Sequence, residues 1–433
     1  MKEQLMVVHG SGPLKGEVSV DGAKNSVLVL MATTLLVDGT FVFENVPVLE
    51  DVIVMAELLR QIGSEVIFDR LNKKLVITTK IKTSHIPADL LNKLRASILV
   101  LAPILARTGI ATFSEPGGCN LGKRPLDYHY KALEKLGVQF THASQTFAKV
   151  TNFSANKIVL DYPSVGATET ALLAAVNIAG HTTIVNAALE PEVLELVEVL
   201  KIMGAKISYQ IPATIIVEGG FKLQPFNRTI MPDRLEAGSL ILAALITNGQ
   251  ITLKNVRPTD LELFLEKISE MGHEVTAGTD TITCKATSKP KAVSVRTAPY
   301  PGFPTDLLSP MMSLLCLTPG ESFIEEGVFD DRLNHVPFLN SMGADINLKS
   351  KTYAHIFGVA QLVGADVEAT NIRSACALVL AGLTANGITT ISNVYHWYRG
   401  YGEMLEKLQS LGANISVVDK QDYFENFHKQ NLA

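Results

Sequence analysis

The chain has 433 residues, of which 47% are hydrophobic and 19% are charged, and its formal net charge is -5. This length exceeds the size at which one hydrophobic core keeps growing, so we expect two domains. The acidic balance argues against a general nucleic-acid-binding protein, which needs a broad basic surface. The apolar runs fall short of the roughly 20 residues that span a bilayer, and no signal-peptide pattern opens the chain, so we expect a cytoplasmic protein with no membrane segment.

A repeated pattern follows an opening strand, 5–20, which we expect to pair with the distal half of the chain. In the first copy an apolar helix over 26–37 ends near Gly39, a β-rich run follows, and an amphipathic helix over 51–62 ends at Gly63. Both glycines recur about every 70 residues. The first series is Gly39, Gly109, Gly180, Gly249, Gly320 and Gly387, and the second is Gly63, Gly137, Gly204, Gly272, Gly343 and Gly412.

Two glycine series in step predict six βαβαββ units, because helices commonly end at a residue with positive φ, which glycine adopts without steric cost. Three units per domain is the simplest arrangement. Helices that are apolar all round need burial, so they should lie inside with the sheets facing outward. The predicted fold is a two-domain, inside-out α/β barrel. One domain covers residues 22–230 and the other covers 1–21 plus 231–433, with the join in the aperiodic, proline-containing stretch 226–232.

Cations occur where helices are expected to begin, although the positive end of the helix dipole disfavours them by about 0.3–1 kcal/mol each. Any one of them could be a surface side chain or half of an ion pair between domains. As a set, they favour binding of one or two anionic ligands, which gain from both the helical N–H groups and the side-chain charge. The seven motifs are centred on Lys24, Arg95, Arg124, Arg234, Arg332, Arg373 and Arg399. We place Arg124, Arg332 and Arg399 in loops that enter the second helices of their units, and the other four at the starts of first helices.

Four cysteines are scattered along the chain without CxxC pairing or nearby histidines at metal-ligand spacing, so neither a disulfide framework nor a metal site is expected. Cys119 stands apart, because it lies in a glycine-rich loop beside two cations that favour a thiolate. It could act as a general acid or a nucleophile, or be an ordinary loop cysteine. Cys284, Cys316 and Cys376 fit strand or apolar-helix patterns and should be buried.

Asp306 is the acid at a helix start where other units place cations. It could be a simple helix-terminal carboxylate, or a base that faces the cations and deprotonates a hydroxyl group.

Taken together, these motifs resemble the enolpyruvyl transferase superfamily and, in detail, its UDP-N-acetylglucosamine 1-carboxyvinyltransferase family. The cysteine loop is specific to the resemblance, because members of the superfamily that use shikimate lack it. The matching stretches cover nearly the whole chain. They are 22–25, 95–97, 116–127, 164–168, 231–238, 296–306 and 399–401.

The resemblance implies an enzyme that transfers the enolpyruvyl group of phosphoenolpyruvate to the 3-hydroxyl of UDP-N-acetylglucosamine and releases phosphate, in the first committed step of peptidoglycan synthesis. It implies no metal and no redox cofactor, so positive side chains would stabilise the charge of an addition–elimination reaction. Fosfomycin-type inhibitors would be possible partners of the thiol.

The resemblance also implies a role for each residue. Cys119 would handle the methylene carbon of phosphoenolpyruvate, and Asp306 would take the proton of the sugar hydroxyl, with Arg332 positioning it near the acceptor. Asn371 stands at a catalytic position. The residues expected to hold phosphoenolpyruvate and its phosphate are Lys24, Arg95, Arg124, Arg373 and Arg399. The remaining contacts, to the sugar, uridine and diphosphate, are Asn25, Arg124, Pro125, Leu126, Asp127, Ser164, Val165, Gly166 and Val328.

Four departures from the family pattern leave two alternatives open. Asn371 replaces an acid that lies close to the reacting carbons, Tyr162 replaces a common lysine, Tyr398 replaces an acid, and 307–310 differs after Asp306. Tyr162 favours a paralogue that uses another uridine nucleotide as acceptor. Asn371, which cannot exchange a proton at neutral pH, favours a non-catalytic nucleotide-sugar-binding protein.

Overall fold

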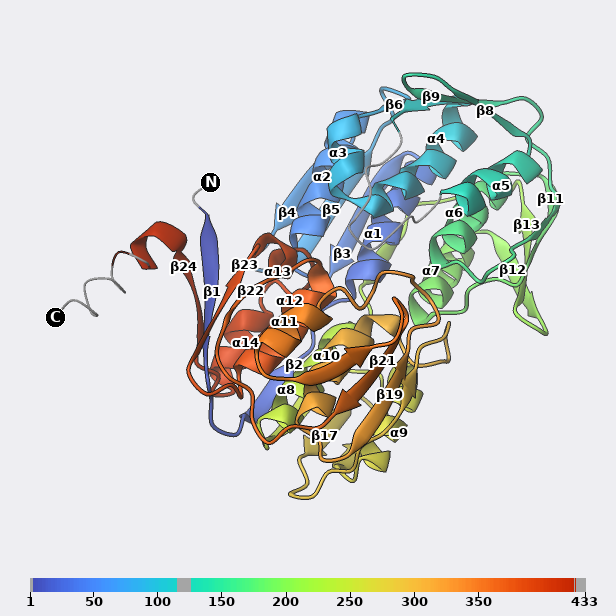
Figure 1. The fold of residues 1–433 in the computed structure, drawn as a ribbon. Helices are drawn as coiled ribbons and strands as arrows, with labels where there is room; N and C mark the ends of the chain where they lie inside the picture. The colour runs from blue at the N-terminus through green and yellow to red at the C-terminus, as the bar shows by residue number, and fades with distance from the viewer. Residues whose placement is uncertain (1–2, 115–125, 424, 426–433) are drawn as a thin grey trace. The chain divides into compact units, whose positions relative to one another are not determined.

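The computed structural model describes residues 3–114, 126–423 and 425. These residues form two compact units (Figure 1). Each unit has its own hydrophobic core. Among the described residues, unit I covers 22–114 and 126–231, and unit II combines 3–21 with 232–423 and 425. The opening segment therefore belongs with the distal half, as the sequence predicted.

Three four-stranded sheets form in the described part of unit I, and they share one strand order. A short edge strand pairs in parallel with the second strand, and the remaining two pairings are antiparallel. The first sheet has the order β14 (Asn227–Thr229), β3 (Gly39–Glu44), β5 (Lys74–Thr79), β4 (Glu65–Asp69). The second is β6 (His85–Ile86), β7 (Ile110–Phe113), β9 (Thr146–Val150), β8 (Val138–His142). The third is β10 (Lys157–Val159), β11 (Gly180–Val185), β13 (Thr214–Gly219), β12 (Lys206–Gln210).

The described part of unit II has three sheets with the same order. They begin with β2 (Lys15–Ser19), β15 (Gln250–Lys254), β17 (Thr281–Lys285), β16 (Glu274–Ala277). Next come β18 (Val295–Arg296), β19 (Glu321–Glu325), β21 (Tyr353–Phe357), β20 (Asp345–Leu348). The last is β22 (Asp366–Glu368), β23 (Ile388–Ser392), β1 (Gln4–His9), β24 (Ile415–Asp419).

The pairing of β1 and β2 with strands far along the chain confirms one prediction and corrects another. β1 lies between β23 and β24, and β2 pairs in parallel with β15. The segment 5–20 is thus two strands in different sheets and not one strand, because Gly10, Gly12 and Pro13 interrupt it. The stretch 226–232 likewise contains β14, which pairs with β3.

One set of helices is apolar and almost wholly buried, as the sequence predicted. In unit II, helices of this set contact one another within the core (Figure 1). The set comprises α1 (Lys24–Thr33), α4 (Leu101–Thr108), α6 (Val165–Ala175), α8 (Arg234–Ile246), α10 (Thr305–Cys316) and α12 (Ile372–Gly382). The second helices of the units are α2 (Glu50–Ile62), α5 (Asp127–Lys135), α7 (Pro191–Ile202), α9 (Glu262–Glu270), α11 (Val336–Ser341) and α14 (Met404–Ser410). The shorter helices are α3 (Ala88–Lys93), α13 (Tyr395–Gly400), and the 3₁₀ helices η1 (Thr34–Leu36), η2 (Arg95–Val100) and η3 (Pro258–Leu261).

The apolar run 96–106 forms two consecutive elements, η2 followed by α4. Pro103 gives the physical reason. It has no N–H to donate to the carbonyl of Leu99, so regular α-helical hydrogen bonding cannot pass through this point, and a 3₁₀ segment precedes it.

The predicted glycine positions have positive φ in eleven of the twelve cases. The exception is Gly249, where glycine is required for close packing: an added Cβ would lie 2.1 Å from the carbonyl oxygen of Leu14. Eleven of the glycines are therefore explained by their backbone conformation, and Gly249 is explained by the close approach of the chain before β2.

Candidate functional site

In unit II, Asp306 lies in the first turn of α10 and contacts two arginines. Its Oδ2 accepts a hydrogen bond from Nη2 of Arg373 at 2.8 Å, and its Oδ1 accepts one from Nη2 of Arg332. The arginine side chains are only 6% and 2% exposed, whereas that of Asp306 is 25% exposed. Two buried guanidinium groups therefore orient a carboxylate that solvent or a ligand can still reach.

Arg373 has a second partner in Tyr401. Its Nη1 donates to the Tyr401 hydroxyl at 2.9 Å, and its guanidinium lies 5.3 Å from the centre of that ring. Burial opposes the charge of Arg373, but the Asp306 carboxylate and the Tyr401 oxygen outweigh this effect and raise the pKa of Arg373 well above its usual value. Arg373 therefore remains a cation in its buried position.

Asn371 is the N-cap of α12. Its Oδ1 accepts hydrogen bonds from the backbone N–H groups of Arg373 at 2.9 Å and Ser374 at 3.0 Å, and the Ser374 hydroxyl returns a contact to the backbone N–H of Asn371. Its Nδ2 donates to Asn334 and Thr370, both at 3.2 Å. Both ends of the amide are thus used, and the cap fixes the backbone from which Arg373 extends.

We expected Arg399 to lie in a loop that enters a helix. In the structure it is buried and lies within the short helix α13. Aromatic packing explains the difference: the rings of Trp397 and Tyr401, four residues apart, lie 5.0 Å from one another and stabilise a helical turn here. Arg234 opens α8, where Asp233 caps the helix, and its guanidinium lies 5.8 Å from the Tyr300 ring centre.

Val328 lies in the turn after β19. Its backbone N–H donates to Oε1 of Glu326 at 2.7 Å. Arg332 follows in the turn before α11, and its Nε donates to the Thr305 hydroxyl at 3.1 Å. The Thr305 hydroxyl also donates to Glu326 at 2.8 Å, so these contacts connect Val328, through Glu326 and Thr305, with Arg332. Arg332 and Arg373 in turn meet at Asp306, and Asn371 is two residues before Arg373.

In unit I, Lys24 opens α1 and pairs with Asp51 of α2 at 3.3 Å, and both side chains are nearly buried. Lys24, Arg332 and Arg373 therefore each contact an acid within their own unit. Burying a cation without a counter-charge costs several kcal/mol. The acidic partner offsets this cost for each of the three side chains. The sequence analysis expected Asp306 to face the cations, but it did not single out Asp51, the partner of Lys24.

The first turn of α6 is built around a buried histidine. Ser164 caps the helix by accepting a hydrogen bond from the backbone N–H of Ala167 at 3.4 Å. An added Cβ at Gly166 would lie 2.8 Å from Cε1 of His129, whose Nδ1 is 2.8 Å from the Thr170 hydroxyl oxygen. Burial and the nearby charge of Arg95 lower the pKa of His129 to about 3, so its ring is neutral at physiological pH.

His129 was not singled out from the sequence, although it lies two residues after Asp127 at the end of a matching stretch. Asp127 opens α5 and Leu126 precedes it as the N-cap. Arg95 opens η2, and Asn25 and Val165 are half-buried residues in the first turns of α1 and α6. The predictions for Cys119, Arg124 and Pro125 concern residues outside the described ranges.

We expect Gly166→Ala to lower the free energy of unfolding by about 1–3 kcal/mol, because the new methyl group would overlap the His129 ring and displace the first turn of α6. Chemical denaturation measures this change. Gly12→Ala is the matched control, since an added Cβ at Gly12 meets nothing within 4 Å. Equal stabilities of the two variants would show that Gly166 is not under steric constraint.

The remaining cysteines are buried as predicted. Cys284 lies in β17, Cys316 in α10 and Cys376 in α12, and none of the three forms a disulfide. Burial raises the pKa of Cys284 and Cys316 to about 12 and that of Cys376 to about 11. All three thiols are therefore protonated and unreactive near neutral pH.

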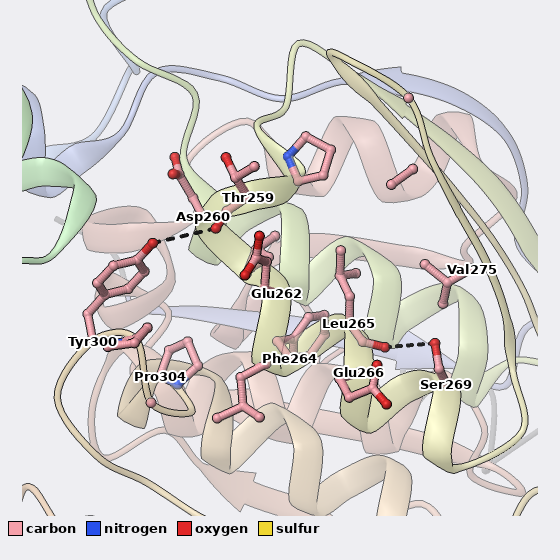
Figure 2. Close-up of a pocket in the computed structure, with 17 residues that line it drawn as sticks. Thr259, Asp260, Glu262, Phe264, Leu265, Glu266, Ser269, Val275, Tyr300 and Pro304 are labelled. Atoms are coloured by element: carbon pink, nitrogen blue, oxygen red, sulfur yellow. Dashed lines mark hydrogen bonds between the residues drawn. The ribbon is translucent and has the colours of Figure 1, made fainter.

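A cavity of about 850 Å³ in unit II is lined by η3, α9 and the 300–304 segment (Figure 2). Its lining includes Asp260, Glu262 and Glu266, with no lysine, arginine or histidine. Figure 2 shows the Tyr300 hydroxyl donating to the Thr259 carbonyl at its edge. An acidic lining repels anionic ligands, so this cavity does not suit the phosphate-bearing compounds that the cation motifs favour.

No cluster of three or more histidine, cysteine, aspartate or glutamate side chains in residues 3–114, 126–423 and 425 has a geometry that could hold a metal ion. Within the same residues, every helix is too short or too polar to cross a bilayer.

Comparison with known proteins defines the class. The model of the EPSP synthase (3-phosphoshikimate 1-carboxyvinyltransferase) family matches residues 8–408. The chain belongs to this family of enolpyruvyl transferases, as its motifs indicated.

Two curated relatives place it more closely within the class. UDP-N-acetylglucosamine 1-carboxyvinyltransferase 1 of Caldanaerobacter subterraneus is 44% identical over 410 residues, which are 94% of this chain and 98% of the relative. UDP-N-acetylglucosamine 1-carboxyvinyltransferase of Thermotoga petrophila is 41% identical over 422 residues, which are 96% of this chain and 99% of the relative.

Solved structures support the same fold. The enolpyruvyl transferase NikO from Streptomyces tendae superimposes with a TM-score of 0.87 at 26% identity, covering 96% of this chain and 99% of that one. EPSP synthase from Acinetobacter baumannii gives a TM-score of 0.74 at 18% identity, covering 96% of this chain and all of the other, and supports the fold alone.

Proposed function

We propose that this protein transfers the enolpyruvyl group of phosphoenolpyruvate to the 3-hydroxyl of UDP-N-acetylglucosamine, releasing phosphate, in the first committed step of peptidoglycan synthesis. The observation that carries the proposal is 41–44% identity over nearly the full length of relatives that bear the name of this activity. The arrangement of Arg332 and Arg373 on Asp306 supports it, since the reaction needs an oriented base beside positive charge.

In the proposed reaction Asp306 takes the proton of the sugar hydroxyl as its oxygen attacks C2 of phosphoenolpyruvate. Cys119 gives a proton to the methylene carbon, so that a tetrahedral phosphate-bearing adduct forms. Loss of a proton from the methyl carbon and departure of phosphate then restore the double bond. Lys24, Arg95, Arg124, Arg373 and Arg399 would stabilise the phosphate and carboxylate charges.

The acceptor would be held by the segments that carry the remaining motifs. These are Asn25, Arg124, Pro125, Leu126, Asp127, Ser164, Val165, Gly166, Val328 and Arg332. In unit I the neutral His129 supports this assignment, because it gives the first turn of α6 a fixed hydrogen-bonding surface without adding charge.

We also propose a domain organisation and a cellular role for the protein. We assign units I and II as the two domains and interpret each as an inside-out α/β barrel of three βαβαββ repeats. The equal strand order of the six sheets in the described residues and the buried apolar helices support this interpretation. A role in cell-wall synthesis, with consequences for cell shape and division, would place the enzyme in the cytoplasm, where both substrates occur.

A phosphate-release assay tests the function. Purified protein is mixed with phosphoenolpyruvate and UDP-N-acetylglucosamine, and the same mixture without the nucleotide sugar is the control. We expect phosphate release that depends on UDP-N-acetylglucosamine. Release only with a different uridine nucleotide would support the paralogue to which Tyr162 points, and binding without release would support a non-catalytic protein.

We expect Asn371→Asp to leave turnover at or below that of the wild type. The structure has adapted to the amide: its oxygen caps α12 and its nitrogen donates to Asn334 and Thr370, so a carboxylate would place an acceptor against Asn334 Oδ1. Steady-state phosphate release measures the effect. A turnover clearly above the wild-type value would show that the amide limits the reaction.

A further inference from the structure

Glu326 is a buried carboxylate for which the proposed reaction has no role. It follows β19, is only 4% exposed, and accepts four hydrogen bonds. Its Oε1 accepts from the Thr297 hydroxyl at 2.8 Å and from the backbone N–H groups of Val328 and Phe329 at 2.7 and 3.0 Å. Its Oε2 accepts from the Thr305 hydroxyl at 2.8 Å. A buried carboxylate satisfied on both oxygens is a fixed, well-oriented group.

Thr305 connects Glu326 to Arg332 through two hydrogen bonds. Because its single hydroxyl proton is donated to Glu326, the oxygen is left to accept from Nε of Arg332 at 3.1 Å. The same guanidinium uses Nη2 to contact Asp306. Phe329, whose N–H is held by Glu326, places its ring 5.1 Å from that guanidinium. Glu326 therefore supports Arg332 from two directions.

We propose that Glu326 is a positioning residue that couples the Val328 turn to Asp306, through Thr305 and Arg332. One oxygen fixes the backbone of the turn expected to contact the nucleotide sugar, and the other fixes the arginine that orients the base. The Val328 turn and Asp306, both in unit II, are then held in a fixed geometry relative to one another. The inference rests on the proposed function for its kinetic consequences, whereas the contacts themselves belong to unit II alone.

The direction of the hydrogen bonds makes the proposal specific. Glu326→Gln keeps the shape, but an amide nitrogen facing Thr305 would donate to the hydroxyl, whose own proton would then compete with Nε–H of Arg332. Thr305→Val keeps the volume and removes the relay, whereas Thr305→Ser retains a hydroxyl. A role that depends only on packing would not separate valine from serine in this way.

The test compares the kinetics of Thr305→Val, Thr305→Ser and Glu326→Gln with those of the wild type. We expect Thr305→Val to lose roughly 10- to 100-fold in kcat with little change in KM for UDP-N-acetylglucosamine, and Thr305→Ser to recover most of the loss. Glu326→Gln should both lower kcat and raise KM, because it also releases the Val328 turn. In Thr305→Val the acidic limb of the pH–rate profile should move to higher pH, since Asp306 loses a neighbouring positive charge.

Crystal structures of the same variants keep the inference testable apart from the activity. We expect the Arg332 guanidinium to leave Asp306 in Thr305→Val and Glu326→Gln but not in Thr305→Ser. Wild-type kcat and pH profile in Thr305→Val, or an unmoved Arg332 in both variant structures, would overturn the proposal. If the wild-type protein released no phosphate, the proposed function would fail, and the position of Arg332 alone would decide the role of Glu326.

Discussion

Asp306→Asn should reduce turnover by roughly 10²- to 10⁴-fold while the protein still binds UDP-N-acetylglucosamine. The amide keeps the shape of the side chain but cannot accept a proton from the sugar hydroxyl at neutral pH, and general-base catalysis contributes about this factor. Phosphate release gives the rate, and calorimetric titration with the nucleotide sugar gives the affinity. Retained binding with lost turnover assigns Asp306 to the chemical step.

The same substitution should also destabilise unit II. It leaves Arg332 and Arg373 buried without a carboxylate, and we expect a loss of about 1–3 kcal/mol, less than for a fully buried pair because Asp306 is partly exposed. Asp38→Asn is the matched control, since Asp38 pairs with Arg107 at 2.8 Å on the surface of unit I. It should change neither turnover nor, beyond about 0.5 kcal/mol, stability. Wild-type turnover in Asp306→Asn would rule out Asp306 as the base.

Cys119→Ser should lower turnover by roughly 100-fold or more, because a serine hydroxyl is a far weaker acid and nucleophile than a thiol beside two cations. We also expect fosfomycin to react with the Cys119 thiol of the wild type and not with the variant. Intact-protein mass spectrometry tests this: we expect one adduct on the wild type and none on the variant. Burial protects the other three thiols, whose pKa values are raised to between about 11 and 12, so one adduct reports Cys119.

A cysteine from the core provides the control for this experiment. Cys284→Ala should keep both the adduct and the turnover, because Cys284 is buried in β17. An adduct that persists in Cys119→Ser, or a variant with the wild-type rate, would remove Cys119 from the proposed mechanism.

Local patterns in the sequence predicted the elements of the fold well. Helix-terminal glycines and apolar helices depend on interactions within a few residues, and eleven of the twelve glycines have the expected positive φ. One error arose where glycine and proline interrupt an expected strand: Gly10, Gly12 and Pro13 divide the segment 5–20 into β1 and β2.

Only part of the candidate site could be predicted from the sequence. Cations and Asp306 could be identified because they recur at equivalent helix starts. The resemblance placed Arg332 near Asp306, but the contact of Arg373 with Asp306 and that of Lys24 with Asp51 were not predicted, since Asp306 is 67 positions from Arg373 and such contacts depend on how the repeats pack. Glu326 and His129 were missed for the same reason: a buried polar side chain gains its role from groups that surround it in three dimensions.

The most direct test of the proposed activity is to identify the product formed from phosphoenolpyruvate when UDP-N-acetylglucosamine and 3-phosphoshikimate are offered together. Mass spectrometry and NMR of the reaction mixture would identify the compound that gains the enolpyruvyl group. We predict an enolpyruvyl ether at the 3-hydroxyl of UDP-N-acetylglucosamine, with one phosphate released for each ether formed. An enolpyruvyl group found on the shikimate, or phosphate released without any ether on the nucleotide sugar, would contradict the account.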